Sequence, residues 1–149
     1  MFSRWPSPFE NRPIELLEVH FSVIPGQTEN GSGTGAASSG LNGTKGSELT
    51  LHLRVASNSE ELRFKVSFDW IHAFRVLDEG ALLGLWIAKS KLTTPVGLSS
   101  FRINSPAMLS EWVDDHFAKD RKTYFIAGAN ECVEVLADCI PSIELEGPE

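Results

Sequence analysis

Side chains able to carry acid–base chemistry gather in one apolar and aromatic stretch of the chain, residues 68–86. They are His72, Arg75, Asp78 and Glu79. Two adjacent carboxyl groups beside a histidine and an arginine could act as a general acid and a general base in a pocket. The pattern also has a structural interpretation, because Asp78 precedes a run with helical spacing. There it fits the N-cap, with Glu79 in the first turn.

The groups that usually accompany such a pair are missing from the sequence. The chain has no GxSxG, HExxH, Walker or CxxC motif. Its four histidines are scattered without a metal-binding spacing. Its two cysteines, Cys132 and Cys139, are expected to be free, buried, structural thiols. We therefore expect no catalytic residue, no metal and no cofactor, in a protein that is not an enzyme.

A segment rich in glycine and serine, residues 26–47, contains a run that resembles a phosphate-binding loop. No helical pattern follows this run, and Lys45 is followed by Gly46 rather than by the Ser or Thr of a P-loop. The segment has too few apolar residues to offset the entropy of ordering it. We expect a flexible loop within a single domain, residues 1–149.

Negative charge is concentrated in the last third of the chain. The chain has 13 Lys and Arg against 20 Asp and Glu, a net charge of -7. Residues 100–149 contain four of the basic and ten of the acidic residues, so they carry -6 of that charge. This sign argues against nucleic acid as a ligand. An acidic face could be solvated surface or could meet a basic protein. The candidate partner-binding residues are Glu131, Glu134, Asp138, Glu144, Asp114 and Asp115.

The first half of the chain predicts strands. Residues 1–13 have no periodicity and are expected to form an irregular arm, from which Phe2, Trp5 and Phe9 could dock on the domain. Residues 14–23 alternate polar and apolar positions, which predicts a strand that buries Leu17, Val19, Phe21 and Val23. The same alternation predicts an antiparallel hairpin from residues 49–55 and 62–68.

The second half combines strands and helices. One short helix is expected after Asp78 and another after Ser105, where Pro106 fits the first helical position. Further strands are expected at residues 101–103, 123–127, 131–136 and 143–145. These elements predict an α+β fold: a mainly antiparallel sheet of about five to seven strands, with two helices packed on one face.

Nothing in the sequence indicates a membrane or an export pathway. No stretch approaches the roughly 20 apolar residues that a membrane helix needs. The N-terminus lacks the apolar core and small-residue cleavage site of a secretory signal. We expect a cytoplasmic protein without membrane contact.

A family resemblance rests on four groups of residues: Phe74–Gly80 with Leu82, Leu83 and Trp86; Ser105 with Trp112; Tyr124–Ile126; and Asn130–Leu136 with Pro141. Over roughly residues 64–145, the chain resembles small bacterial immunity-type proteins of toxin–immunity systems. The resemblance implies a non-enzymatic protein that binds and inhibits a co-encoded toxin domain. The loop at 26–47 has no place in this pattern.

Two alternatives to this function remain open. The protein could be a structural or adaptor subunit that forms a homodimer through a sheet edge or through the region of Trp70 and Trp86. It could also be a small-ligand binder or an enzyme with a pocket near Asp78.

Overall fold

The computed structural model describes residues 2–23, 47–56, 60–103 and 123–147. The described part contains nine strands and one helical segment. The strands are β1 (Phe2–Arg4), β2 (Ile14–Val23), β3 (Ser47–Val55), β4 (Leu62–Phe68), β5 (Ile71–Asp78), β6 (Ser100–Ile103), β7 (Thr123–Ala127), β8 (Glu131–Ala137) and β9 (Ser142–Glu146). A 3₁₀ turn, η1 (Glu79–Leu82), leads directly into the helix α2 (Leu83–Ser90).

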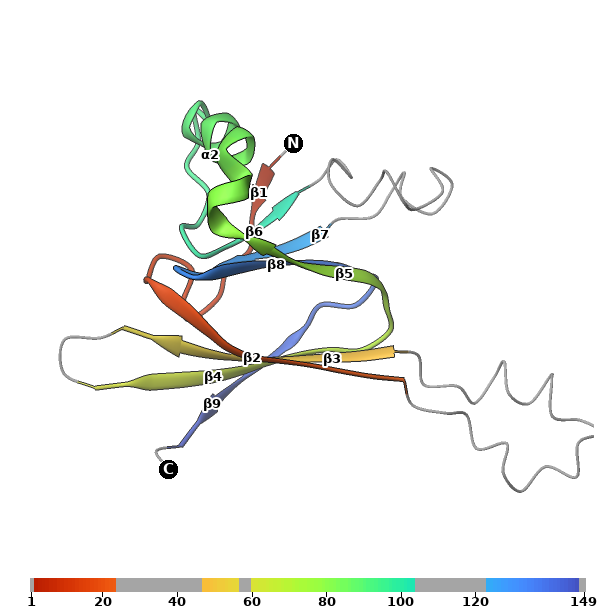
Figure 1. Ribbon diagram of the computed structural model, residues 1–149. Helices are drawn as coiled ribbons and strands as arrows, with labels where there is room; N and C mark the ends of the chain where they lie inside the picture. The colour runs from red at the N-terminus through yellow and green to blue at the C-terminus, as the bar shows by residue number, and fades with distance from the viewer. Residues whose placement is uncertain (1, 24–46, 57–59, 104–122, 148–149) are drawn as a thin grey trace, which may run out of the picture.

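The strands form two antiparallel sheets that pack face to face. One sheet has the order β1-β6-β7-β8-β5 and the other the order β2-β3-β4-β9. Figure 1 shows the two sheets as separate layers, with α2 standing on the outer side of the five-stranded sheet. The fold is therefore a two-sheet sandwich with a helical third layer on one side.

The main core lies between the two sheets. Strands β3 and β4 send alternate side chains inward, as the hairpin pattern predicted, and the buried ones are Leu49, Leu51, Leu53, Val55, Phe64, Val66 and Phe68. The five-stranded sheet contributes Tyr124, Ile126, Val133, Val135 and Ala137 to the same cluster. On the other side of that sheet, Phe101, Phe125 and Cys132 pack against Leu82 and Trp86 of the helical segment. Strands β7 and β8 are thus covered on both faces.

The N-terminal arm is part of the core. Trp5 and Phe9 are buried, 4% and 0% exposed, which confirms that both dock on the domain. The Trp5 ring lies 5.0 Å from that of Tyr124. Glu10 fastens the arm, since its carboxylate binds the Arg4 guanidinium at 2.7 and 3.0 Å and its carbonyl accepts the Ser99 N–H at 2.8 Å. The first strand, β1, was not predicted.

Strand β2 exists as predicted, but its buried side chains are different. Ile14 and Leu16 enter the core, whereas Leu17 is 41% exposed and Val23 is 65% exposed. The register with β3 shifts between Leu16 and Glu18, so the strand contains a bulge there. A bulge inserts one extra residue and reverses the alternation beyond it. For this reason Val19 packs against the core after the bulge, while Leu17 does not.

The fold prediction holds in its coarse form. The structure is mainly antiparallel, the helix after Asp78 is present, and β7 is central in its sheet. The strands are divided between two sheets instead of forming one, because the turn at Asp69 and Trp70 carries the chain from β4 in one sheet to β5 in the other. Trp70 has a φ of 56° in this turn.

Two further points concern helices. The helix predicted after Ser105 lies outside the described residues. Among the residues that are described, no helix is long and apolar enough to span a membrane.

Candidate functional site

The junction of β5 with the helical segment is built by Asp78. Its backbone is extended, with φ -65° and ψ 131°, and its side-chain oxygen accepts the Gly80 N–H at 2.7 Å. Glu79 occupies the first turn. The capping interpretation of Asp78 is confirmed. A carboxylate that caps a helix is held by backbone N–H groups, and this geometry leaves Asp78 turned toward its own helix.

His72 and Arg75 face separate partners. The Nε2 atom of His72 lies 2.8 Å from an Asp138 carboxylate oxygen, and the Nε of Arg75 donates to Glu134 at 3.0 Å. Together with Asp78, which bonds to Gly80, these side chains do not converge on one pocket. Of the four predicted pocket residues, Glu79 alone lines a cavity described below.

Glu134 is not a surface residue. Its side chain is completely buried, and one oxygen binds Arg75, which is itself 26% exposed. Burial raises the pKa of Glu134 above its usual value, although the neighbouring Arg75 lowers it. The second oxygen, Oε1, has no hydrogen-bond partner among the residues that the structure describes. A buried residue cannot contact a partner protein, so the prediction of Glu134 as a partner contact is corrected: strand alternation placed it on the covered outer face of the five-stranded sheet.

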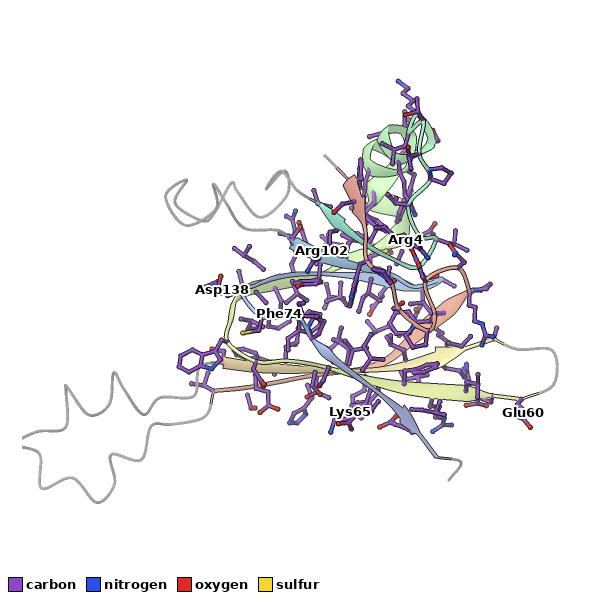
Figure 2. The ribbon with its side chains drawn as sticks, turned by 180° about the vertical axis from the view of Figure 1, so that it is seen from behind. Arg4, Glu60, Lys65, Phe74, Arg102 and Asp138 are labelled. Atoms are coloured by element: carbon purple, nitrogen blue, oxygen red, sulfur yellow. The ribbon has the colours of Figure 1, made fainter. Side chains whose placement is uncertain are left out.

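The other predicted partner contacts do not share one surface. Glu131 and Asp138 lie at opposite ends of β8, about 23 Å apart at the usual rise of a strand. Glu144 lies on the outer face of the four-stranded sheet, 4.0 Å from the Lys65 ammonium; in Figure 2, Lys65 points away from the sandwich on that side. Asp114 and Asp115 lie outside the described residues.

The outer face of the four-stranded sheet carries three pairs of basic and acidic side chains. Basic side chains of the two central strands meet acidic side chains of the edge strands. The pairs are Arg54 with Glu15, His52 with Glu146, and Lys65 with Glu144. His52 is on the solvent-exposed face, as predicted, and the Glu144 carboxylate on this face already lies beside a cation.

Three of the described carboxylates without an ion pair lie near one another, where β5 leads into the helical segment. Asp78, at the end of β5, lies directly opposite Glu131 of β8 in register. Glu79 follows Asp78 in the chain, and no described residue forms an ion pair with any of the three. We call Asp78, Glu79 and Glu131 the acidic corner. Like charges directly opposite each other in a sheet are destabilising.

The helix beside the acidic corner is apolar on both sides. Leu82 and Trp86 face the sheet, whereas Leu83 is 65% exposed and Ile87 is 46% exposed. Leu83 and Ile87 are four residues apart within α2, so they lie on one side of this helix. A surface helix normally turns a polar face to solvent. Leu83 and Ile87 therefore form an outward apolar stripe on α2.

A cavity of about 290 Å³ lies under the other side of the helix. It is lined by Ile14, Trp86, Lys89 and the turn at Ala127–Ala129, with Glu79 also in the wall. A second hollow of about 470 Å³ shares Trp86, Lys89 and Leu98 with the first. Lys89 therefore stands between two adjoining hollows.

The cysteines are both free. Cys132 is buried under the helix, and burial, together with the Glu79 and Asp78 carboxylates, raises the pKa of its thiol to about 11. Cys139 is exposed, which differs from the expectation of two buried thiols, because it lies in the turn after β8. No group of three or more His, Cys, Asp or Glu among the described residues could hold a metal ion.

The sequence matches no protein-family model, and neither the curated proteins nor the solved structures contain a significantly similar chain. The site must therefore be judged on its geometry. Sequence reasoning missed the outward stripe and Lys89. A signal was present, since residues 81–88 are apolar or glycine throughout and end at Lys89; such a run cannot bury every face of a helix that packs on one sheet.

Proposed function

We propose that this protein is a non-enzymatic, immunity-type protein that binds a basic protein domain through the outward face of α2 and the acidic corner. The observation that carries the proposal is that an exposed apolar stripe, Leu83 and Ile87, follows directly on three carboxylates that form no ion pair within the described part of the chain. The finer part, that the partner is a co-encoded toxin domain, rests on the resemblance of residues 64–145.

The apolar stripe supplies a reason for binding. Leu83 and Ile87 are exposed on a helix that already packs its other side on the sheet. Interfaces gain most of their affinity from a few apolar anchors that become fully desolvated at the centre of the contact. A partner that covers this stripe would remove two large side chains from water without disturbing the core beneath them.

The negative charge of the acidic corner indicates that the partner is basic. Asp78 and Glu131 lie opposite each other in the register of β5 and β8, Glu79 follows Asp78 in the chain, and none of the three has a cation in an ion pair among the described residues. An arginine or lysine side chain placed between them would relieve the repulsion and gain a charge-assisted bond. Complementary charge of this kind speeds association and fixes the orientation of the complex.

The test is capture from the organism that carries the gene, at low and high salt, with matched variants. The wild type is expected to recover a single basic protein that added salt weakens. Leu83→Asp and Glu131→Lys are each expected to lose it, because one places charge in the apolar stripe and the other reverses a charge of the corner. Leu145→Asp is the control, since Leu145 is 61% exposed but lies on β9 of the other sheet.

Whether the partner is a toxin that this protein inhibits is tested by growth assays. The recovered protein, expressed alone, should be toxic, and co-expression with the wild type but not with Leu83→Asp should restore growth. Capture that Leu83→Asp and Glu131→Lys leave unchanged would refute the surface. Recovery of the protein itself alone would favour the self-associating structural or adaptor subunit.

A further inference from the structure

Lys89 is a half-buried cation that forms no ion pair within the described part of the chain. Arg4, Arg54, Arg63, Lys65 and Arg75 each have a carboxylate within 4.0 Å. The Lys89 ammonium has none among the described residues. Its hydrogen-bond partner is a neutral group, the carbonyl of Leu98, at 3.1 Å. Half-buried charges are usually paired, because taking an ion out of water is unfavourable.

Aromatic rings hold the ammonium in place. Lys89 Nζ lies 4.3 Å from the centre of the Phe101 ring and 5.8 Å from that of Trp86. Ring faces stabilise a cation and fix its position. Burial nevertheless lowers the pKa of Lys89 below its usual value. This direction is expected when the loss of water around a cation is not fully offset by nearby negative charge.

The Lys89 ammonium has N–H groups that are free to bind a ligand, whereas several other N–H groups of the described cavity wall are already bonded. The Trp86 indole N–H is bound to the Glu79 carbonyl at 3.1 Å. The N–H groups of Gly128 and Ala129 are bound to the carbonyls of Glu131 and Ile14. A lysine ammonium has three donors, and the Leu98 carbonyl takes one of them.

We propose that the cavity under α2 binds a small organic monocarboxylate, whose carboxylate pairs with Lys89 and whose apolar body lies against Trp86 and Ile14. The volume of about 290 Å³ is at the small end of the range for ligand pockets, roughly 300–1,000 Å³. The described wall contains one cationic side chain, that of Lys89, which matches a single carboxylate. The remaining wall, which includes Ile14 and Ala127, favours an apolar body.

The cavity and the proposed partner surface share Glu79, but the residues that are varied to test them differ. Trp86 and Lys89 lie on the sheet side of α2, whereas Leu83 and Ile87 lie on its solvent side. Ligand binding and partner binding can therefore be tested independently, with different probes and different variants.

The experiment is a titration of the ¹⁵N-labelled full chain with benzoate at constant ionic strength, followed by the indole N–H signal of Trp86. Trp86→Phe identifies that signal among the four tryptophans. The wild type is expected to show a saturable shift with benzoate. Benzamide, which has the same shape without the charge, should bind at least tenfold more weakly.

Substitutions test whether Lys89 binds the carboxylate of benzoate. Lys89→Met keeps the length of the side chain and should weaken benzoate at least tenfold. Lys91→Met is the matched control, since Lys91 lies two residues further on and is exposed, and it should bind as the wild type does. Ala129→Leu is a second variant in case Lys89→Met does not fold. It should fill the mouth of the cavity from an exposed position and abolish the shift.

Four results would overturn the proposal. They are the absence of a saturable shift in the wild type, equal binding of benzoate by Lys89→Met, equal binding of benzamide, and inorganic phosphate binding as tightly as benzoate. The last would assign the cavity to any small anion and remove the role of the apolar wall.

Discussion

Removing the arginine of the buried ion pair should harm the protein far more than removing the acid. Glu134 is completely buried, whereas Arg75 is 26% exposed. In Arg75→Met, the Glu134 carboxylate keeps its burial and loses its counter-charge. Breaking a buried pair in this way costs about 3–5 kcal/mol. In Glu134→Leu, the freed guanidinium can turn its charged end toward water, so we expect a loss at least about 1 kcal/mol smaller.

The dependence on pH distinguishes this explanation from a simple loss of packing. In the wild type, burial already raises the pKa of folded Glu134 above the value of 4.5 for an unperturbed glutamate. A raised folded pKa means that stability is greatest below the unfolded pKa and is lost as the pH rises through the folded one. Without Arg75 the folded pKa should rise further. Arg75→Met should then lose up to about 1.4 kcal/mol per pH unit in that window.

The assay is urea unfolding of both variants and of the double variant at pH 5 and pH 7, monitored by tryptophan fluorescence. The double variant Arg75→Met/Glu134→Leu replaces the pair by apolar side chains and should lie within about 1 kcal/mol of the wild type or above it. The reasoning is refuted if Arg75→Met costs no more than Glu134→Leu at pH 7. It also fails if the Arg75→Met deficit is the same at pH 5.

Three further predictions concern single positions. In the native protein at pH 8, a thiol reagent should modify Cys139 and spare Cys132, whose thiol is buried with a pKa of about 11, and unfolding should expose the second thiol; two equal rates would contradict this. Leu16→Ala should reduce the free energy of unfolding by about 2–5 kcal/mol and Leu17→Ala by much less, and the reverse order would disprove the bulge. Asp78→Ala should cost about 0.5–2 kcal/mol in thermal or urea unfolding, whereas Asp78→Asn, which keeps the cap, should be nearly neutral.

The sequence predicts local structure well wherever burial follows a simple period. The hairpin of β3 and β4 alternates without interruption, and the structure buries the expected side chains. Asp78 was identifiable as a cap because a carboxylate before an apolar helical run satisfies free backbone N–H groups. Such features depend on neighbours within a few residues, which the sequence displays directly.

Features that depend on distant parts of the chain were not predictable. The bulge after Leu16 changes the phase of β2 and has no signature in its own residues. The division into two sheets depends on the turn at Trp70, which alternation on either side does not reveal. We predicted that Glu134 lies on the surface because it is acidic. In the structure it pairs with Arg75, which lies 59 residues away in the chain, so the sequence around Glu134 does not reveal its burial.

The pairing of β1 with β6 affects how the protein is made. Phe2 lies opposite Ile103, so the first strand of the chain cannot find its place until about a hundred residues have followed it. At the usual pace of translation, about 5–20 residues per second, that wait is roughly 5–20 seconds. During this time Trp5 and Phe9, which end up in the core, have no finished surface to cover them. Until β6 and β7 have been synthesised, these aromatic side chains are therefore exposed to association with other chains.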